Sequence, residues 1–227
     1  MTKDLVFVNA VPKAAAIRLD TESIHLWQIP YTLSQGRAPL LALLGTYLCK
    51  PLSEVTLAQD TRGKPRLSGV DSGLVGEQRL EFNWSHSGDY ALVALSRGLA
   101  LGVDIERLDK SLRAIEIARR FFDSAEAETL ASLGVPVRNH AFIGLWCAKE
   151  AILKASGEGL SFGLARLVFE WHTDRDWDLA RIDPALGRKD DWRLMGFNAA
   201  PGYRGALAWR GPLRRIAAFR LAQTNAS

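Results

Sequence analysis

The clearest alternation of apolar and polar positions lies in the segment LGVDIE, residues 101–106. Its period of two is typical of a half-buried β-strand, so Asp104 and Glu106 should project from one strand face, about 7 Å apart. No local positive charge neutralises the two carboxylates. The pattern therefore predicts a strand that carries an unexplained pair of acids.

The same reading predicts the other elements. Strands are expected at residues 23–30, 80–84, 90–96, 99–106, 164–171, 192–197, 203–209 and 216–221. Helices are expected at residues 36–50, 111–121, 123–132 and 136–154. Asp123 and Glu126 have the spacing of a capping box, and Gly157 is placed to end the last helix. Residues 53–79 are rich in Gly, Ser, Asp and Arg, which predicts loops.

Two segments share the pattern strand, Arg-Gly turn, strand, one around Gly98 and one around Gly211. Each is predicted to be a β-hairpin, and each follows a strand and helices in its own half of the chain. Any two amphipathic hairpins would match about as well, so the repeat is weak evidence. If it is real, it implies two similar α+β lobes.

Composition and charge place limits on the class of protein. A chain of 227 residues with 48% hydrophobic content is long enough for one or two packed domains. Neither a signal peptide nor a membrane span is indicated, and two Cys without zinc spacing suggest a reducing compartment, so we expect a cytoplasmic protein. Cys49 and Cys147 are expected to be small buried residues. The net charge of +4 fits an anionic partner, but no basic run of nucleic-acid type appears.

The segment LWCAKEAILK, residues 145–154, places Glu150 and Lys154 one helical turn apart. Taken alone, this pair reads as solvent-exposed, and the strand acids Asp104 and Glu106 can equally be solvated charges at a sheet edge. The three acids together, however, form a hard oxygen donor set that suits Mg²⁺ or Mn²⁺ rather than zinc. Magnesium usually bridges to substrate phosphates, so the set favours metal-assisted displacement at phosphorus, with Lys154 as a neighbouring charge.

Two further segments are weaker signals. WSHS places Ser85, His86 and Ser87 in a predicted turn between two strands, where a lone His is more often structural than catalytic. RGKP places two cations, one of them Lys64, in a second turn.

Taken together, GVDIE, WCAKEAILK, WSHS and GKP resemble the signature segments of 4'-phosphopantetheinyl transferases of the surfactin-synthetase-activating type. The resemblance runs from about residue 24 to about residue 219. It implies an α/β (α+β) fold of two pseudo-symmetric lobes in one chain, each a small, mostly antiparallel sheet packed with helices, with a coenzyme A cleft between them. It also implies transfer of the phosphopantetheine arm of coenzyme A to a serine of an apo acyl or peptidyl carrier protein, with release of adenosine 3',5'-bisphosphate.

The resemblance assigns roles by motif position. Asp104, Glu106 and Glu150 would hold Mg²⁺, and Glu150 would also be the general base, directly or through a metal-bound water. Lys154 would contact the pyrophosphate of coenzyme A and stabilise charge on the departing side. The remaining expected coenzyme A contacts are Ser85, His86, Gly63, Lys64 and Pro65, with Arg37 as the one clear basic residue before the first helix.

The predicted division is an N-terminal extension at 1–21, an N-terminal lobe at 22–107, a C-terminal lobe at 108–221 and a disordered tail at 222–227. No role is predicted for the extension. Arg113, Arg119 and Arg120 lie beside two Phe just after the acidic strand, and we expect this helix to steer an acidic carrier protein. Two lobes in one chain make a monomer the simplest expectation, without nucleic acid or membrane as partner.

Two alternatives stay open from the residues. One is a metal-dependent phosphohydrolase of a nucleotide or of coenzyme A, which needs the same carboxylates but uses water as nucleophile. The other is a non-catalytic coenzyme A binding module. Cys147 shares a helix face with Glu150 but has no motif-like relation to any His, so it is expected to be structural. The carrier, its pathway and the range of acyl groups accepted are not readable from the sequence.

Overall fold

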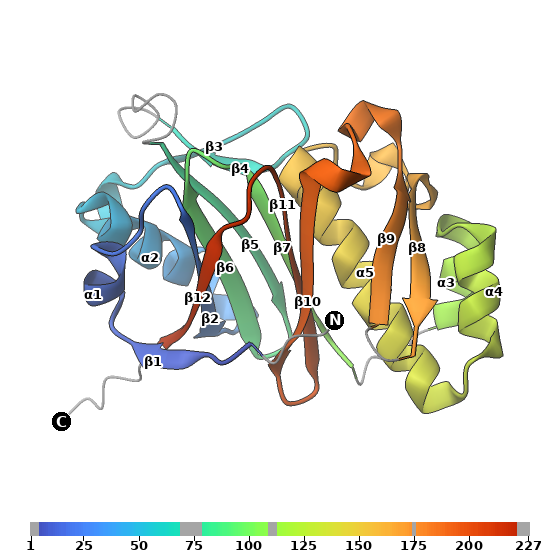
Figure 1. The fold of residues 1–227 in the computed structure, drawn as a ribbon. Helices are drawn as coiled ribbons and strands as arrows, with labels where there is room; N and C mark the ends of the chain where they lie inside the picture. Colours follow the sequence, from blue (N-terminus) through green and yellow to red (C-terminus); the bar gives the residue numbers. More distant parts are fainter. Residues whose placement is uncertain (1–4, 69–78, 109–112, 174–175, 222–227) are drawn as a thin grey trace.

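The computed structural model describes residues 5–68, 79–108, 113–173 and 176–221. It contains two main sheets that lie side by side, each with helices on one face (Figure 1). The first has the order β1-β12-β2-β6-β5, from Val8–Ala10, Arg215–Leu221, Ser23–Pro30, Tyr90–Arg97 and Leu80–Ser87. The second has the order β10-β11-β7, from Trp192–Ala200, Tyr203–Arg210 and Leu101–Arg107. The mixed fold with two lobes that the sequence predicts is confirmed.

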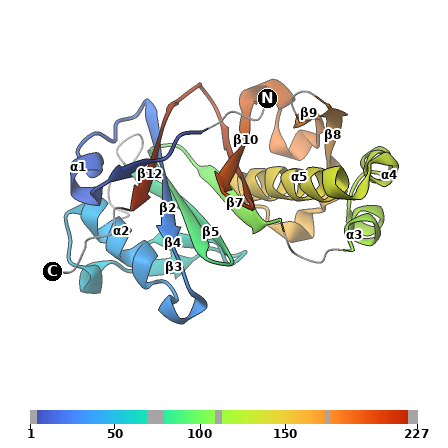
Figure 2. The ribbon, with the colours of Figure 1, turned by 90° about the horizontal axis from the view of Figure 1, so that it is seen from below.

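Helices and two short hairpins complete the architecture. The hairpins are β3–β4 (Leu57–Gln59 and Pro65–Leu67) and β8–β9 (Leu167–His172 and Asp176–Ile182). The helices are α1 (Pro12–Ala16), α2 (Ala38–Leu48), α3 (Ala114–Phe121), α4 (Ser124–Ser132) and α5 (Val135–Ser156). Helices α1 and α2 cover the first sheet, α5 runs along the second sheet, and α3 and α4 pack at the N-terminal half of α5 (Figure 2).

The two sheets repeat one topology. Strands β2, β5 and β6 pair in the order β2-β6-β5, and strands β7, β10 and β11 pair in the order β7-β11-β10. In both repeats a helix and a short hairpin, α2 with β3–β4 or α5 with β8–β9, come between the first strand and the other two. The strand pairing thus places β7 in the second repeat, whereas the predicted lobe boundary at residue 107 left it in the first.

Both predicted Arg-Gly hairpins are wrong. Strand β6 already pairs with β2 and β5, so it has no free edge for β7, which pairs instead with β11. Strand β11 likewise pairs with β10 and β7, and β12 crosses to the first sheet and pairs in parallel with β2. Gly98 and Gly211, both with positive φ, are therefore the points where the chain crosses from one sheet to the other.

Most predicted elements are confirmed with small shifts. Asp123 accepts from the Ala125 N–H while Glu126 accepts from the Asp123 N–H, which confirms the capping box of α4. Gly157 ends α5 in a left-handed conformation. Strands β1, β3, β4 and β9 and helix α1 were not predicted. Residues 111 and 112 of the predicted helix 111–121, and the predicted tail at 222–227, lie outside the described residues.

The described part of the predicted extension belongs to the first sheet. Strand β1 pairs in parallel with β12, and Phe7, Ala15 and Leu19 are buried. Three apolar clusters hold the molecule together: one between α1, α2 and the first sheet, one between the two sheets, and one around α5. Leu101, Val103 and Ile105 of β7 lie in the middle cluster, which leaves Gly102, Asp104 and Glu106 on the face toward α5 and β5.

Candidate active site

Asp104 lies at the centre of a buried polar group formed by β7, β5 and α5. The Lys154 ammonium donates to Asp104 Oδ1 at 2.6 Å and to Ser85 Oγ at 3.0 Å, and the Ser85 hydroxyl donates to the same Oδ1 at 2.7 Å. Burial disfavours a charged amine, but Asp104 and then Glu150 oppose it, and the net effect raises the pKa of Lys154 above its ordinary value. Lys154 is therefore a cation fixed beside Asp104.

Glu106 continues this arrangement two residues along β7. The Ser87 hydroxyl donates to Glu106 Oε2 at 2.7 Å, just as Ser85 donates to Asp104. The two serines alternate on the face of β5 that lies against β7, and this confirms that both acids project from one face of their strand. WSHS is thus the end of strand β5 and not a turn; the turn is formed by Gly88 and Asp89.

Glu150 is half-buried on α5, and the charges of both strand carboxylates affect its pKa. Burial raises its pKa to about 7, Lys154 opposes the rise, and the charges of Asp104 and Glu106 add to it. The three predicted acids therefore lie in one electrostatic neighbourhood. A carboxylate with a pKa near neutrality is suited to proton transfer.

A metal would find the expected type of donor at this site. Asp104 Oδ2 is buried and has no hydrogen-bond partner among the described residues, which is costly unless a ligand meets it. Oxygen donors of this kind suit Mg²⁺. Within residues 5–68, 79–108, 113–173 and 176–221, however, no three acidic, His or Cys side chains are gathered as a metal-binding group. That the three acids meet at one point therefore stays a prediction. Lys154 and Ser85 bind the other Asp104 oxygen, Oδ1.

Gly102 explains why the acidic strand and the helix can share a site. A Cβ atom at this position would lie 2.1 Å from the Ala151 carbonyl oxygen and 2.4 Å from the Ala155 nitrogen. Only a residue without a side chain lets β7 approach α5 so closely. The glycine of GVDIE therefore sets the distance between the elements that carry Asp104 and Lys154.

The GKP segment lies at the C-terminal end of α5, in the turn between β3 and β4. The Lys64 ammonium donates to the carbonyl oxygens of Lys154 and Leu101, the latter at 3.4 Å. Burial, and then Arg66, lower its pKa to about 8. Of this segment, Gly63 and Pro65 stay predicted coenzyme A contacts, while the Lys64 ammonium is turned toward the helix end.

For His86 the structure gives ring contacts, and for Arg37 it gives an exposed position. His86 lies on the face of β5 opposite to Ser85, with its ring centroid 4.7 Å from that of Tyr31 and 5.3 Å from that of Trp84. Arg37 is exposed at the start of α2. Their roles as coenzyme A contacts remain predictions.

The two cysteines differ. Cys147 is fully buried, its Sγ lies 3.7 Å from the Arg204 carbonyl oxygen, and burial raises the pKa of its thiol, which fits the structural role expected for it. Cys49, predicted to be buried, is exposed because it ends α2 in a left-handed conformation.

Lys149, which no sequence motif singled out, precedes Glu150 but points to a different side of α5. Its ammonium lies 2.8 Å from Glu126 Oε2, and both side chains are fully buried. It also donates to the carbonyl oxygens of Leu164, at 2.9 Å, and Leu167. Glu126 could be recognised as a capping residue from its spacing, but nothing local indicates its ion pair, since the partner lies in another helix.

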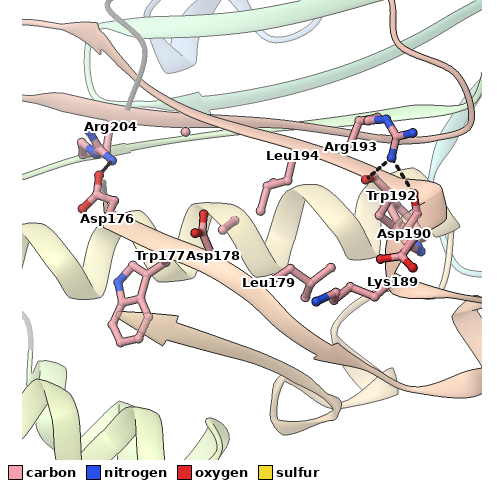
Figure 3. A pocket seen from close by; sticks show the side chains of 13 residues that line it. Asp176, Trp177, Asp178, Leu179, Lys189, Asp190, Trp192, Arg193, Leu194 and Arg204 are labelled. Carbon is pink, nitrogen blue, oxygen red and sulfur yellow. Dashed lines mark hydrogen bonds and ion pairs between the residues drawn. The ribbon is translucent and has the colours of Figure 1, made fainter. Parts of the chain in front are cut away.

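A cavity of about 470 Å³ lies on another face of α5 (Figure 3). Its walls are β9 and β10, Gly144 and Ala148 form part of its lining, and Arg204 closes one end by contacts with Asp176 and with Asn198. None of the predicted site residues lines it. The polar group around Asp104 is therefore the better candidate for the chemistry.

Comparisons with known proteins agree with this site. The model of the 4'-phosphopantetheinyl transferase superfamily matches residues 100–204, which include β7 and α5. A putative 4'-phosphopantetheinyl transferase of Synechocystis, slr0495, is 36% identical over 162 residues, which are 70% of this chain and 61% of that protein. The transferase psf-1 of Bacillus pumilus is 32% identical over 162 residues, 71% of this chain and 64% of psf-1. The chain thus spans less than two thirds of these two relatives.

The 4'-phosphopantetheinyl transferase HetI of Nostoc is 31% identical over 185 residues, which are 66% of this chain and 76% of HetI. Among the described residues, no helix combines the length and the apolar composition that crossing a membrane requires. Given the identity to HetI over most of its length, and the family match across the acidic strand and α5, this chain belongs to the 4'-phosphopantetheinyl transferase superfamily.

Proposed function

We propose that the protein transfers the 4'-phosphopantetheine arm of coenzyme A to a serine hydroxyl of an apo acyl or peptidyl carrier protein, with Mg²⁺ as cofactor. The observation that carries the proposal is the polar group of Asp104, Lys154 and Ser85 beside Glu150. It combines a buried carboxylate oxygen that has no partner in the described part of the chain, a fixed cation and a carboxyl group with a pKa of about 7.

The residues divide the work of a displacement at phosphorus. Glu150, directly or through a water, accepts the proton of the carrier serine, whose oxygen forms a bond to the phosphorus next to the pantetheine arm. The bond from that phosphorus to the bridging oxygen breaks, and adenosine 3',5'-bisphosphate leaves. Lys154 stabilises the negative charge on the pyrophosphate oxygens.

Asp104, Glu106 and Glu150 are the residues that would hold Mg²⁺. When bound, the ion would neutralise charge on the pyrophosphate and orient it. Mn²⁺ fits the same oxygen donors. Ser85 and Ser87 keep the two strand carboxylates in place by donating to them.

We also propose that the surfactin-synthetase-activating type is the nearest subclass, since the motif spacing resembles it and two repeats share one chain. One chain would then hold a complete site and act as a monomer in the cytoplasm. The position of β7 supports a site that is complete within one chain, because it brings the acids of the second repeat against β5 of the first repeat.

Mass spectrometry of a carrier protein tests the function. The protein, coenzyme A, Mg²⁺ and an apo carrier protein are mixed, and the carrier should gain the mass of one phosphopantetheine arm. The gain should require Mg²⁺ and vanish in Asp104→Ala and in Glu150→Gln. Coenzyme A breakdown without carrier modification would instead identify a phosphohydrolase, and coenzyme A binding without turnover would identify a binding module.

A further inference from the structure

The turn between β3 and β4 is held in one conformation by Asp60. Its Oδ1 accepts the backbone N–H groups of Arg62 at 3.0 Å and Lys64 at 2.9 Å, and its Oδ2 accepts from Arg66 Nε at 3.1 Å. Gly63 supplies the positive φ of 83° that the turn needs. The backbone position from which the Lys64 side chain starts is therefore well defined.

The Lys64 side chain closes the C-terminal end of α5. The last carbonyl groups of a helix have no partner within the helix, and positive charge is favoured there. Lys64 Nζ donates to the Lys154 carbonyl oxygen and, at 3.4 Å, to that of Leu101 on β7. One ammonium group thus joins the helix end to the acidic strand.

These two carbonyl groups belong to the two elements, α5 and β7, that the Lys154–Asp104 contact joins. The Lys154 side chain crosses from α5 to β7, where it reaches Asp104 and, at 3.3 Å, the Val103 carbonyl oxygen. Lys64 binds the backbone of Lys154, where this crossing begins, and also the β7 backbone at Leu101, two residues before Val103. Gly102 makes the same two backbones touch.

We propose that Lys64 is a positioning residue that acts through Lys154: it keeps the end of α5 on β7 so that the Lys154 ammonium meets Asp104. This differs from the contact with the adenine and 3'-phosphate end of coenzyme A that the GKP motif predicts. Two of the three N–H groups of the Lys64 ammonium are directed at backbone carbonyl groups. The proposal rests on the transferase function proposed above.

Lys64→Met separates the two roles when coenzyme A is compared with 3'-dephospho-coenzyme A. If Lys64 is a positioning residue, the variant should lower kcat by about tenfold with both coenzyme A and 3'-dephospho-coenzyme A, because a small displacement of a reacting group is costly. The ratio of the two KM values should stay as in the wild-type protein. Lys64→Arg, which keeps the cation, should recover part of kcat. A phosphate-binding role would instead raise KM for coenzyme A, bring the two donors to equal KM and leave kcat intact, and this would overturn the proposal.

Arg62→Met is the matched control. Arg62 lies in the same turn and contacts the same helix end, through the Gly157 carbonyl oxygen at 3.3 Å and Glu158 at 2.5 Å, but it is exposed and does not reach Lys154. Its kcat should stay within about twofold of the unmodified protein, because exposed ion pairs contribute little. An equal loss in both variants would assign the effect to the turn as a whole and contradict the role of Lys64.

Amide hydrogen exchange tests the inference independently of activity. Lys64→Met should speed exchange in the last turn of α5 and at the start of β7, whereas Arg62→Met should leave the start of β7 unchanged. If the wild-type protein transfers no phosphopantetheine arm to a carrier protein, the proposed function fails. The exchange pattern still decides whether Lys64 joins the end of α5 to the start of β7. Unchanged exchange in Lys64→Met would overturn the proposal.

Discussion

At Gly102, the absence of a side chain determines how closely β7 can approach α5. The sequence predicts the strand and the facing of Asp104 and Glu106 from alternation alone, and the hydrogen bonds from Ser85 and Ser87 confirm it. It does not predict the contact of Gly102 with α5, which joins residues about fifty positions apart.

Gly102→Ala should therefore destabilise the protein and lower its activity. The added methyl group would meet backbone atoms at 2.1 and 2.4 Å, which cannot move without shifting the helix. Overpacking of this kind costs about 1–3 kcal/mol in the free energy of unfolding, measurable by urea denaturation. Displacement of Lys154 from Asp104 should lower kcat as well.

Gly196→Ala in β10 of the same sheet is the control. A Cβ atom there would lie 3.6 Å from Arg204 Nη2, an ordinary contact. Its free energy of unfolding should stay within about 1 kcal/mol of the unmodified protein. Equal stabilities of the two variants would show that close packing at Gly102 is unimportant.

The partner of Lys154 cannot be predicted from its spacing to Glu150. Their spacing correctly places them one turn apart on α5, and the local interpretation was an exposed ion pair. In the structure Lys154 turns instead to Asp104, fifty residues earlier in the chain. A buried carboxylate is a stronger partner than a solvated one, but only the packing of β7 on α5 makes it reachable.

Among the elements, α5 is fastened on two sides by different lysines. Lys154 joins it to β7, while Lys149 joins it to α4 through Glu126 and to Leu164 and the first residue of β8, Leu167. Burial lowers the pKa of Lys149 to about 8 and raises that of Glu126, and each charge offsets part of the shift in the other. The contacts of the two lysines fix the rotation of α5 about its axis, and this rotation decides where Glu150 points.

Removing one partner of the Lys149–Glu126 ion pair should lower the free energy of unfolding by much more than the ion pair itself contributes to it. Lys149→Met or Glu126→Gln leaves one uncompensated charge in the core, and each should lower the free energy of unfolding by about 3–5 kcal/mol in urea denaturation. The double variant should lose less than the sum, because no unpaired charge remains. If the two losses in the free energy of unfolding simply added up, the two charges would not be directly coupled. The control is Lys189→Met, at an exposed lysine, which should leave the free energy of unfolding almost unchanged.

Helix α3 presents a basic outer surface. Arg119 and Arg120 are exposed, Arg120 lies over the ring of Phe121, and Arg113 pairs with Glu116 at 3.3 Å in an exposed position. Phe122 turns inward and stacks on Phe142. The predicted helix is confirmed over its described part, and its role in steering an acidic carrier protein remains a proposal.

Reversing charge on α3 should weaken recognition of the carrier protein. Arg113→Glu with Arg120→Glu should raise KM for the carrier several-fold and leave KM for coenzyme A unchanged, because electrostatic complementarity acts on encounter with the partner. Changing Arg188 and Lys189 to Glu alters the net charge equally at a different surface. A similar rise in that control, or none in the α3 variant, would rule out α3 as the steering surface.

For the molecule as a whole, the crossing of β12 ties the end of the chain to its beginning. Strand β12 lies between β1 and β2 and contributes Ala218 to the apolar cluster between the sheets. The two repeats therefore share the cluster that Leu101, Val103 and Ile105 fill, and β12 packs into it from the first sheet. They should unfold together.

A chain that ends after residue 211 should lose cooperative folding. It would leave an edge of the buried strand β2 unpaired, together with the apolar residues that β12 covers. Thermal unfolding should show a broadened transition or an insoluble protein. A chain that ends after residue 221 keeps β12 and should unfold as the full chain does; if the shorter chain matched it, β12 would be dispensable.

The sequence by itself determined the positions of most helices and strands and the facing of Asp104 and Glu106. These follow from local periodicity, capping and the chemistry of side chains. Only the tertiary structure decided that the two Arg-Gly hairpins open into opposite sheets, that WSHS belongs to a strand, and that Lys64 and Lys154 meet at the end of α5. Which strand edge is free, and which buried charge finds a partner, depends on elements distant in the chain, so no local pattern can carry that information.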